Sequence, residues 1–188
     1  MSNLTLSTIS GTVANGNKVS IPAGQVLYAP GHVIQVVSTY ITTPTSVSVP
    51  ASYQSYTNVP NLAATITPKS TTSKIYVMVR WFGESSAQTT NWDTMFGIKR
   101  DGVSVGAPLG GTTSIGITMA SLSYYADDGN STPEMCTFDY LDSPASVSAI
   151  TYQVYTNCTV AKTLYTNRTV GAGGEFGSSS ITLMEIAQ

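Results

Sequence analysis

The stretch TTSKIYVMVRWFGE, residues 71–84, decides the fold class of this chain. Its side chains alternate between two sets, and because successive side chains of a strand point to opposite sides of a sheet, this period of two predicts a β-strand. One predicted face is wholly apolar, and the other mixes aromatic, methionine and basic side chains. The mixed face favours a sheet covered on both sides, with a neighbouring subunit over the second side. The apolar set is Ile75, Val77, Val79 and Trp81, and the mixed set, our candidate subunit interface, is Lys74, Tyr76, Met78, Arg80 and Phe82.

The same alternation recurs along the chain. Residues 32–41 place Ile34, Val36 and Tyr40 on one face, and residues 61–68 end at Pro68. No segment shows helical spacing, and Gly, Pro, Asn and Asp separate the segments. Short strands at regular spacing predict an all-β sandwich or barrel. The further strands are expected within residues 93–106, 114–125, 134–141, 147–160, 162–170 and 179–187.

Asp101 and Gly102 give the clearest local signal. They stand between two β-prone segments within residues 93–106. An Asp-Gly pair readily adopts the positive backbone angles of a two-residue hairpin turn. We therefore predict a β-hairpin with these two residues at its tip.

The first thirty-one residues differ from the rest. They contain short alternating pieces interrupted by Asn15-Gly16, Pro22-Ala23-Gly24 and Pro30-Gly31, with few large apolar side chains. Such a segment cannot close a core alone. We predict a β-rich docking arm over residues 1–31 and a compact domain over residues 32–188.

The composition narrows the class of function. The chain has 188 residues, of which 41% are hydrophobic and 10% charged, with a net charge of −2, whereas charged residues make up about 25% of an ordinary soluble domain. This balance argues against a basic nucleic-acid binder. No segment approaches the ~20 apolar residues of a membrane-spanning helix, and the start of the chain lacks a signal-peptide pattern. We expect synthesis in the cytoplasm and no insertion into a membrane.

Few residues are suited to metal or catalytic chemistry. His32 is the single histidine, and Cys136 and Cys158 have neither metal-type nor redox-type spacing. Metal sites and catalytic triads require several partners of these kinds. We therefore read His32 as a structural or surface residue and the cysteines as small strand residues. The sequence predicts no catalytic residue, no metal and no cofactor.

The acidic residues leave one enzymatic alternative. Asp127 and Asp128 open a cluster that lacks the spaced oxygen ligands of a calcium loop, so a solvated turn is favoured. A glycosidase would need two carboxylates across a groove. No sequence rule brings two of the four available candidates together, and these are Glu84, Asp93, Asp139 and Asp142.

Aromatic residues near polar loops are the candidate receptor contacts. The loops are residues 83–91 and 126–133, and flat side chains beside amides and carboxylates suit the binding of a sugar or a protein. The alternative, which we favour for every aromatic except Trp92, is packing in the core or at the subunit interface. The candidate set is Trp81, Glu84, Trp92, Asp93, Tyr124, Tyr125, Asp127, Asp128 and Asn130.

An ordered series of motifs resembles a known family. It consists of GHVIQVVSTYITTPT (31–45), NLAATITPKSTTSKIYVMV (61–79), GIKRDG (97–102), YLDSPASVSAITYQV (140–154) and SSSITLMEIAQ (178–188). The series is similar to virion structural proteins of tailed bacteriophages of aquatic bacteria, usually labelled tail-fibre or tail-tip proteins. The resemblance implies a jelly-roll-like β-sandwich that assembles as a trimer.

These observations lead to one main hypothesis and two alternatives. The main hypothesis is a non-enzymatic virion protein, a homotrimeric fibre or tail-tip knob. It docks to other virion proteins through residues 1–31 and presents loops to a host-surface glycan or protein. The first alternative is a capsid decoration protein that sits on a symmetry axis of the head. The second is a tail-associated polysaccharide hydrolase.

Overall fold

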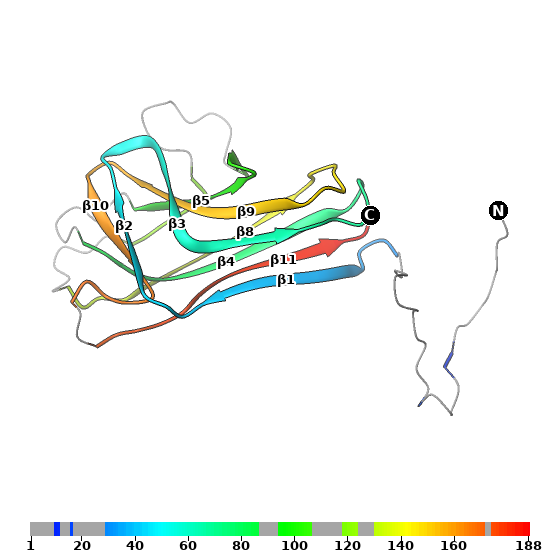
Figure 1. Ribbon diagram of the computed structural model, residues 1–188, viewed down its shortest axis with the longest axis horizontal. Coiled ribbons are helices and arrows are strands. Elements are labelled where there is room, and N and C mark those ends of the chain that lie inside the picture. The colour runs from blue at the N-terminus through cyan, green and yellow to red at the C-terminus, as the bar shows by residue number, and fades with distance from the viewer. Residues whose placement is uncertain are drawn as a thin grey trace.

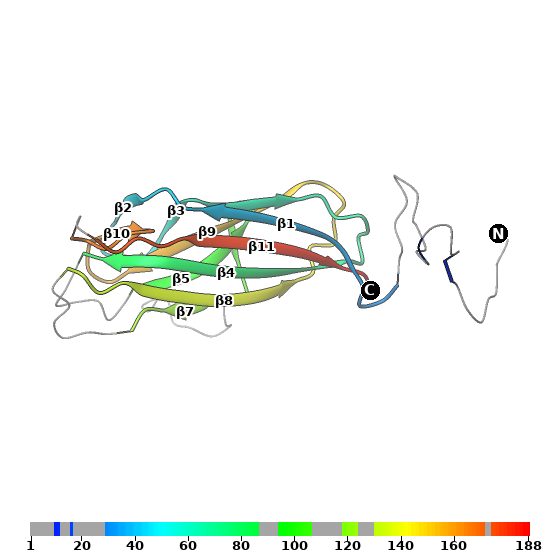
Figure 2. The same ribbon diagram turned by 90° about the horizontal axis from the view of Figure 1, so that it is seen from below.

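A computed structural model describes residues 10–11, 16, 29–86, 94–106, 118–123, 130–171 and 174–188, with the side chains of residues 53 and 54 left out (Figure 1). Within these ranges the secondary structure is all β, in two antiparallel sheets that face each other (Figures 1 and 2). The strands are β1 (Val33–Ile41), β2 (Thr45–Val49), β3 (Ser52–Ile66), β4 (Lys74–Ser85), β5 (Met95–Arg100), β6 (Val103–Val105), β7 (Ala120–Ser121), β8 (Glu134–Asp142), β9 (Ile150–Cys158), β10 (Lys162–Thr166) and β11 (Ser179–Ile186).

The strand order is that of a jelly roll. The first sheet runs β1-β11-β4, with β8 beside β4, and β10-β2 extend the far end of β4. The second sheet runs β3-β9-β5-β6, with β7 also beside β5. Early strands thus pair with late ones in nested order, β1 with β11, β3 with β9 and β4 with β8. This wrapped double sheet confirms the predicted jelly-roll-like sandwich.

The predicted hairpin is confirmed. Asp101 and Gly102 have φ values of 48° and 87° and connect β5 to β6, where Arg100 pairs with Val103. Both angles are positive, as a tight two-residue hairpin requires. Asp101 Oδ1 also accepts the Thr151 backbone N–H at 2.8 Å, which fastens the hairpin to β9.

The core lies between the sheets and contains the apolar set of residues 74–82. Trp81 is fully buried and its ring centroid lies 4.9 Å from that of Phe96 on the opposite sheet. The Trp81 indole N–H donates to Thr166 Oγ1 at 3.0 Å, so the polar atom of this large side chain is satisfied. Burial of each such side chain contributes about 1.5–3 kcal/mol. The predicted strand and its buried face are confirmed.

Two stretches of strand were not predicted. These are β2 and the first part of β3, residues 52–60, whose sequences are rich in Ser, Thr and Tyr. Pro60 falls where the pairing of β3 with β9 shifts register, between Asn58 and Ala63. Proline is tolerated in a strand at such an irregularity, but from sequence it signals a break.

The face expected for residues 32–41 lies on the outside of the sandwich. Val36 and Tyr40 are 55% and 62% exposed, whereas Val37 and Ile41 pack against the core. The pairing of β1 with β11 shifts register between Val33 and Gln35. A one-residue shift moves side chains to the other face, so Ile34 cannot be grouped with Val36 and Tyr40 by alternation alone.

The two ends of the described domain lie side by side. Gly31 N–H donates to the Ala187 carbonyl at 2.8 Å, and Ala187 N–H donates to the His32 carbonyl at 2.9 Å. His32 is exposed. Most of residues 1–31 fall outside the described ranges, so the docking arm stays a prediction. No helix capable of crossing a membrane occurs in the described part of the chain.

Candidate interaction surfaces

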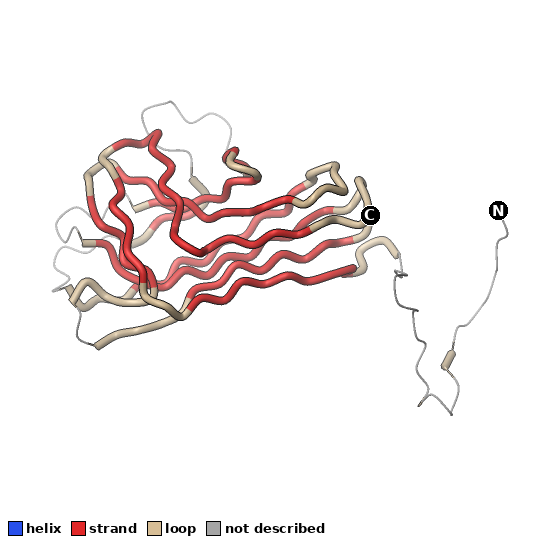
Figure 3. The backbone as a smooth tube through the Cα atoms, viewed as in Figure 1, coloured by secondary structure: helices blue, strands red, loops and turns tan. Residues whose placement is uncertain are grey.

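The long strands give the sandwich two distinct ends. We call the end with residues 31 and 188 the terminal end. We call the end where β4 and β10 stop and β8 and β11 begin the loop end (Figure 3). The hairpin of residues 101–102 lies beside Thr151, near the start of β9 and therefore toward the terminal end. The hairpin and the residues 31 and 188 thus lie at the terminal end, and the segments that lead into β8 and β11 lie at the loop end.

The predicted subunit-interface residues share one surface. We call the outward side chains of β1, β11, β4 and β8 the outer face. Cross-strand register sets Tyr76 between Met184 of β11 and Leu141 of β8. The five interface candidates all point to this face and are half-buried; they are Lys74, Tyr76, Met78, Arg80 and Phe82. Their common face is as predicted, and the interface itself stays a prediction.

Exposed apolar side chains concentrate on the outer face. Eight large hydrophobic side chains of the described residues are exposed, and six lie on this face or beside it. Gly177 packs against the ring of Phe82, which brings the adjacent Phe176 to the edge of the face. A shallow depression of about 250 Å³ lies among Tyr76, Met78 and neighbouring residues of β8. The six are Val33, Val36, Tyr40, Met135, Leu141 and Phe176.

Arg80 belongs to a polar cluster on the outer face. Its Nη2 donates to Ser178 Oγ at 2.9 Å, and its guanidinium carbon lies 5.9 Å from the centroid of the Tyr40 ring. Tyr40 donates to the same Ser178 oxygen at 2.7 Å. The hydrogen bond with Ser178 and the nearby Arg80 lower the pKa of Tyr40. Among the described residues no carboxylate forms an ion pair with Arg80.

Asp139 is the acidic side chain of the outer face. It projects from β8 opposite Met78 of β4. The next outward pair along these two strands is Arg80 and Thr137. The hydrogen bond with Asp139 raises the pKa of Tyr76. Asp139 therefore accepts from a neutral hydroxyl. The Arg80 side chain points instead toward Tyr40 on β1, which is on the same face at the opposite edge of the sheet.

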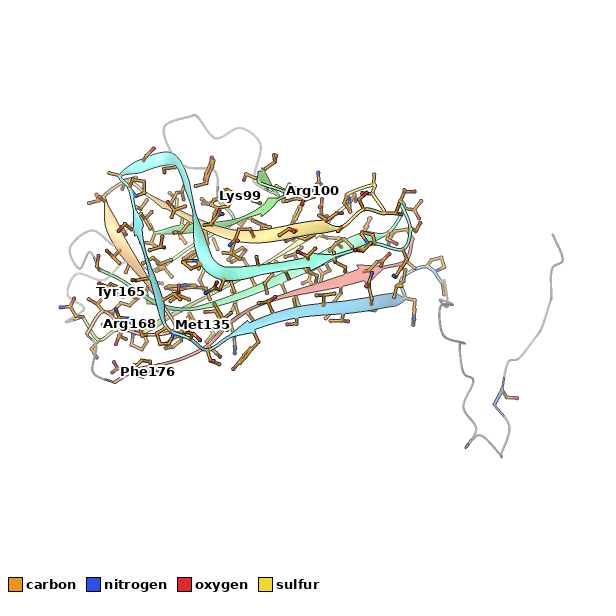
Figure 4. All side chains as sticks on the ribbon, in the orientation of Figure 1. Lys99, Arg100, Met135, Tyr165, Arg168 and Phe176 are labelled. Atoms are coloured by element: carbon orange, nitrogen blue, oxygen red, sulfur yellow. The ribbon has the colours of Figure 1, made fainter. Side chains whose placement is uncertain are left out.

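An arginine–aspartate ion pair joins the two sheets. Arg100 Nη1, on β5, donates to both carboxylate oxygens of Asp142, on β8, at 2.9 and 2.8 Å (Figure 4). The Tyr152 hydroxyl donates to Asp142 Oδ2 at 2.7 Å, and the Ser143 N–H donates to Oδ1 at 2.8 Å. Burial, and then the bond to Asp142, raise the pKa of Tyr152 well above its ordinary value. No local sequence pattern indicates this cluster, because its members come from different strands.

Glu84 fastens two loops at the loop end. Its side chain is 1% exposed. One carboxylate oxygen accepts the Thr132 N–H at 2.9 Å and the other accepts the Val170 N–H. Nearby, the exposed Glu175 accepts from the hydroxyls of Ser131 and Thr169. Residues 130–133, 167–171 and 174–177 are thus held together by two carboxylates.

Apolar and cationic side chains also gather at the loop end (Figure 4). Arg168 lies over the Tyr165 ring with its guanidinium carbon 4.5 Å from the ring centroid. Met135 and Phe176 are each 63% exposed. Three of these side chains come from the same 165–178 segment that Glu84 and Glu175 hold.

Two candidate receptor contacts require correction. Trp81 is fully buried between the sheets, so its alternative assignment to the core is correct. Glu84 is buried by the loops that it binds and is not available to a receptor. Asn130 is half-buried, and its backbone carbonyl accepts the Gly171 N–H at 2.7 Å. The remaining candidates lie outside the described residues: Trp92, Asp93, Tyr124, Tyr125, Asp127 and Asp128.

The glycosidase alternative finds no pair among its described carboxylates. Asp139 and Asp142 are three residues apart on β8, one exposed on the outer face and the other buried. Glu84 is nine residues along β4 from Ile75, the register partner of Asp142, which corresponds to about 30 Å. The carboxylates of glycosidases lie about 5–9.5 Å apart. Asp93, the fourth candidate, lies outside the described residues.

Cys136 and Cys158 are both buried and are not joined in a disulfide. Burial, with a further effect of Glu134, raises the pKa of the Cys136 thiol to about 11, which favours the unreactive thiol form. In the described ranges, no cluster of three or more His, Cys, Asp and Glu side chains is arranged to hold a metal ion.

Comparison with known proteins gives little. No protein-family model and no curated protein matches the sequence. One solved structure, described as "Structure of infectious bursal disease virus Gx strain", is similar with 12% sequence identity and a TM-score of 0.29. The match covers 89% of this chain and 42% of that chain. At this TM-score the likeness supports no assignment of fold or function.

Proposed function

We propose that this chain is a non-enzymatic structural protein of a virion, a homotrimeric knob that attaches through residues 1–31 and presents its loop end to the host surface. The observation that carries the proposal is the two-ended layout. Residue 31 enters the sandwich beside the C-terminal strand, and the loops held by Glu84 lie at the opposite end. An arm at one end and loops at the other suit a protein that connects a particle to an external surface.

The outer face supports the trimeric part of the proposal. It carries the half-buried Tyr76, Met78 and Phe82 among the most exposed apolar side chains. A contiguous apolar surface of this kind marks an interaction site, and its burial contributes about 25 cal/mol per Å² of apolar area. Lys74 and Arg80 belong to the same predicted interface. Three loop ends on one assembly also multiply weak contacts with a repetitive glycan or protein.

Localisation on the intact particle tests the proposal. Gold-labelled antibody against the purified chain is imaged by electron microscopy on assembled phage. Label at the tail tip or fibres supports the attachment role. Label spread over the head makes the chain a decoration protein, and particles that are never labelled overturn the virion role.

An adsorption assay tests the role of the loop end. Purified protein is expected to compete with phage for host cells, and substitutions within residues 130–133 or at Trp92 are expected to reduce that competition. Unchanged competition by these variants contradicts the receptor-contact role of the loops.

A separate assay tests the non-enzymatic part. Host polysaccharide is incubated with high concentrations of the protein, and released reducing ends are measured. We expect none above a heat-denatured control. Release that increases with protein concentration contradicts the proposal and favours a polysaccharide hydrolase.

A further inference from the structure

The Arg80 guanidinium has unused capacity to bind an anion. A guanidinium carries five N–H donors that match a carboxylate. Among the described residues, the printed contacts of Arg80 are a hydrogen bond to the neutral Ser178 hydroxyl and the Tyr40 ring. Its Nε is buried without a hydrogen-bond partner. These contacts fix the position of the cation on the β1 side of the outer face and leave its charge unpaired.

The Asp139 carboxylate has the complementary property on the other side of the same face. It projects from β8 and is exposed, with the neutral Tyr76 hydroxyl as its partner. Tyr40 on β1 and Asp139 on β8 are three strand spacings apart, or about 14 Å. Arg80 itself is on β4, next to β8, and is a diagonal neighbour of Asp139, but its guanidinium turns away from Asp139 toward Ser178 and the Tyr40 ring.

The dimensions and composition of the face suit a second copy of this chain. Four strands about 4.8 Å apart and nine residues long give a flat area of about 600 Å² per copy. In a trimer the three faces together cover about 1,800 Å², or about 600 Å² at each of the three contacts. Most exposed large hydrophobic side chains of the described residues lie on or beside this face, Val36, Tyr40 and Leu141 among them.

The charges are arranged so that the face complements itself. When three copies surround an axis parallel to their strands, with their loop ends pointing the same way, the β1 side of each face meets the β8 side of the next. This orientation brings a cation to an anion and keeps all loop ends on one side of the assembly. Such a shared direction is what attachment at one end and presentation at the other require.

We propose that Arg80 of one copy forms an ion pair with Asp139 of the next, and that this pair fixes the register of the subunit interface. The inference rests on the proposed oligomeric virion protein. Tyr40 and Ser178 act as positioning residues because they hold the guanidinium in the orientation that receives the carboxylate. In a trimer the contact occurs three times around the axis.

Charge reversal tests the ion pair. Full-length wild type, Arg80→Glu, Asp139→Arg and the double variant are compared by size-exclusion chromatography with light scattering over a hundredfold range of concentration. Each single reversal is expected to raise the concentration needed for assembly at least tenfold, because like charges then face each other. The double reversal restores the opposite charges and is expected to return assembly to within about threefold of wild type. Lys69→Glu, an exposed reversal at the terminal end, is expected to leave assembly unchanged.

Each result decides one question. Single variants that assemble like wild type, or a double variant that is not rescued, overturn the ion pair. A wild type that stays monomeric throughout overturns the second copy as the occupant of the face. Circular dichroism verifies that each variant is folded. If a charge reversal does not fold, the neutral variants Arg80→Gln and Asp139→Asn are used in its place. Antibody labelling of the particle is independent of all these results, so failure of the interface and failure of the virion role are distinguishable.

Discussion

Two arginine–aspartate combinations occupy the same sandwich and differ in where their charges are satisfied. Arg100 and Asp142 form an ion pair between the sheets, and Tyr152 adds a buried hydrogen bond. Arg80 and Asp139 lie on adjacent strands of the outer face, their side chains turn to different partners, and both bind only neutral groups in the described chain. The first combination stabilises one subunit, and the second is available to another subunit.

The difference follows from the alternation of a strand. Asp139 and Asp142 are three residues apart on β8, so they point to opposite faces. A carboxylate that points inward is desolvated and requires charged and hydrogen-bonding partners. A carboxylate that points outward remains hydrated without them. The same strand thus carries one acidic group that is buried in the fold and one that we propose for association.

The largest expected effect comes from removing the inward carboxylate. Asp142→Ala leaves the buried Tyr152 hydroxyl and the Arg100 guanidinium without their acceptor. Breaking one side of a buried pair costs about 3 kcal/mol or more. Urea unfolding followed by tryptophan fluorescence measures this loss.

The matched control is Asp139→Ala on the same strand. Its expected change in the free energy of unfolding of the dissociated chain is within about 0.5 kcal/mol, since its side chain is exposed. Equal losses for both variants contradict the division of roles between the two carboxylates.

Glu84 is a third carboxylate for this comparison, and its hydrogen-bond donors are backbone N–H groups. Glu84→Gln replaces one acceptor oxygen with an amide that must face the Thr132 or Val170 N–H. Leaving a buried donor unsatisfied costs about 2 kcal/mol. Hydrogen exchange is expected to become faster at both amides, and mass spectrometry of the two segments measures it.

Glu175→Gln provides the control at the same end. Glu175 is exposed and accepts from hydroxyls, which reorient readily. We expect little change in exchange at Thr132 or Val170. If this variant loosens those amides as much as Glu84→Gln does, burial of the carboxylate is not what holds the loops.

The fold was largely predictable because the decisive signal is local. Alternation at residues 74–82 and the Asp101-Gly102 turn each depend on neighbours in sequence, and both predictions are confirmed. β2 and the start of β3 were missed because their polar side chains and Pro60 resemble a loop. Their strand structure depends on pairing with β10 and β9, which lie about a hundred residues away.

The candidate sites were less predictable because they depend on distant contacts. Trp81 belonged to the predicted apolar face, yet its position next to a polar loop also made it a receptor candidate. Glu84 falls on an outward position of β4, and loops from elsewhere in the chain bury it. The Arg100–Asp142 pair joins residues 42 positions apart, and neither residue has a local feature that indicates its partner.

Alkaline pH provides a smaller test of the inner cluster. Burial and Asp142 raise the pKa of Tyr152 in the folded chain, so unfolding releases its proton once the pH exceeds about 10. The stability from this group is complete below pH 10 and falls by about 1.4 kcal/mol per pH unit above it. Tyr152→Phe is expected to cost about 1 kcal/mol at neutral pH and to remove this contribution to the alkaline slope. Denaturant unfolding from pH 7 to 11 measures both.

Tyr76→Phe is the corresponding control on the outer face. Tyr76 donates to Asp139, but the pair is exposed to water in one chain. We expect the unfolding curve of the dissociated chain to keep its alkaline slope. An equal flattening by both variants contradicts the assignment of that slope to the buried hydroxyl.

The smallest expected effect on folding is that of Arg80. Arg80→Gln removes a charge whose contacts are the Ser178 hydroxyl and the Tyr40 ring, and such groups at a surface contribute less than about 0.5 kcal/mol. Unfolding measured well below the assembly concentration is therefore expected to match wild type. At higher concentration the curves are expected to separate, because only wild type then gains stability from association. A large loss of stability in the dissociated chain instead means that Arg80 stabilises the fold as Arg100 does, and this contradicts the contrast between the two arginines.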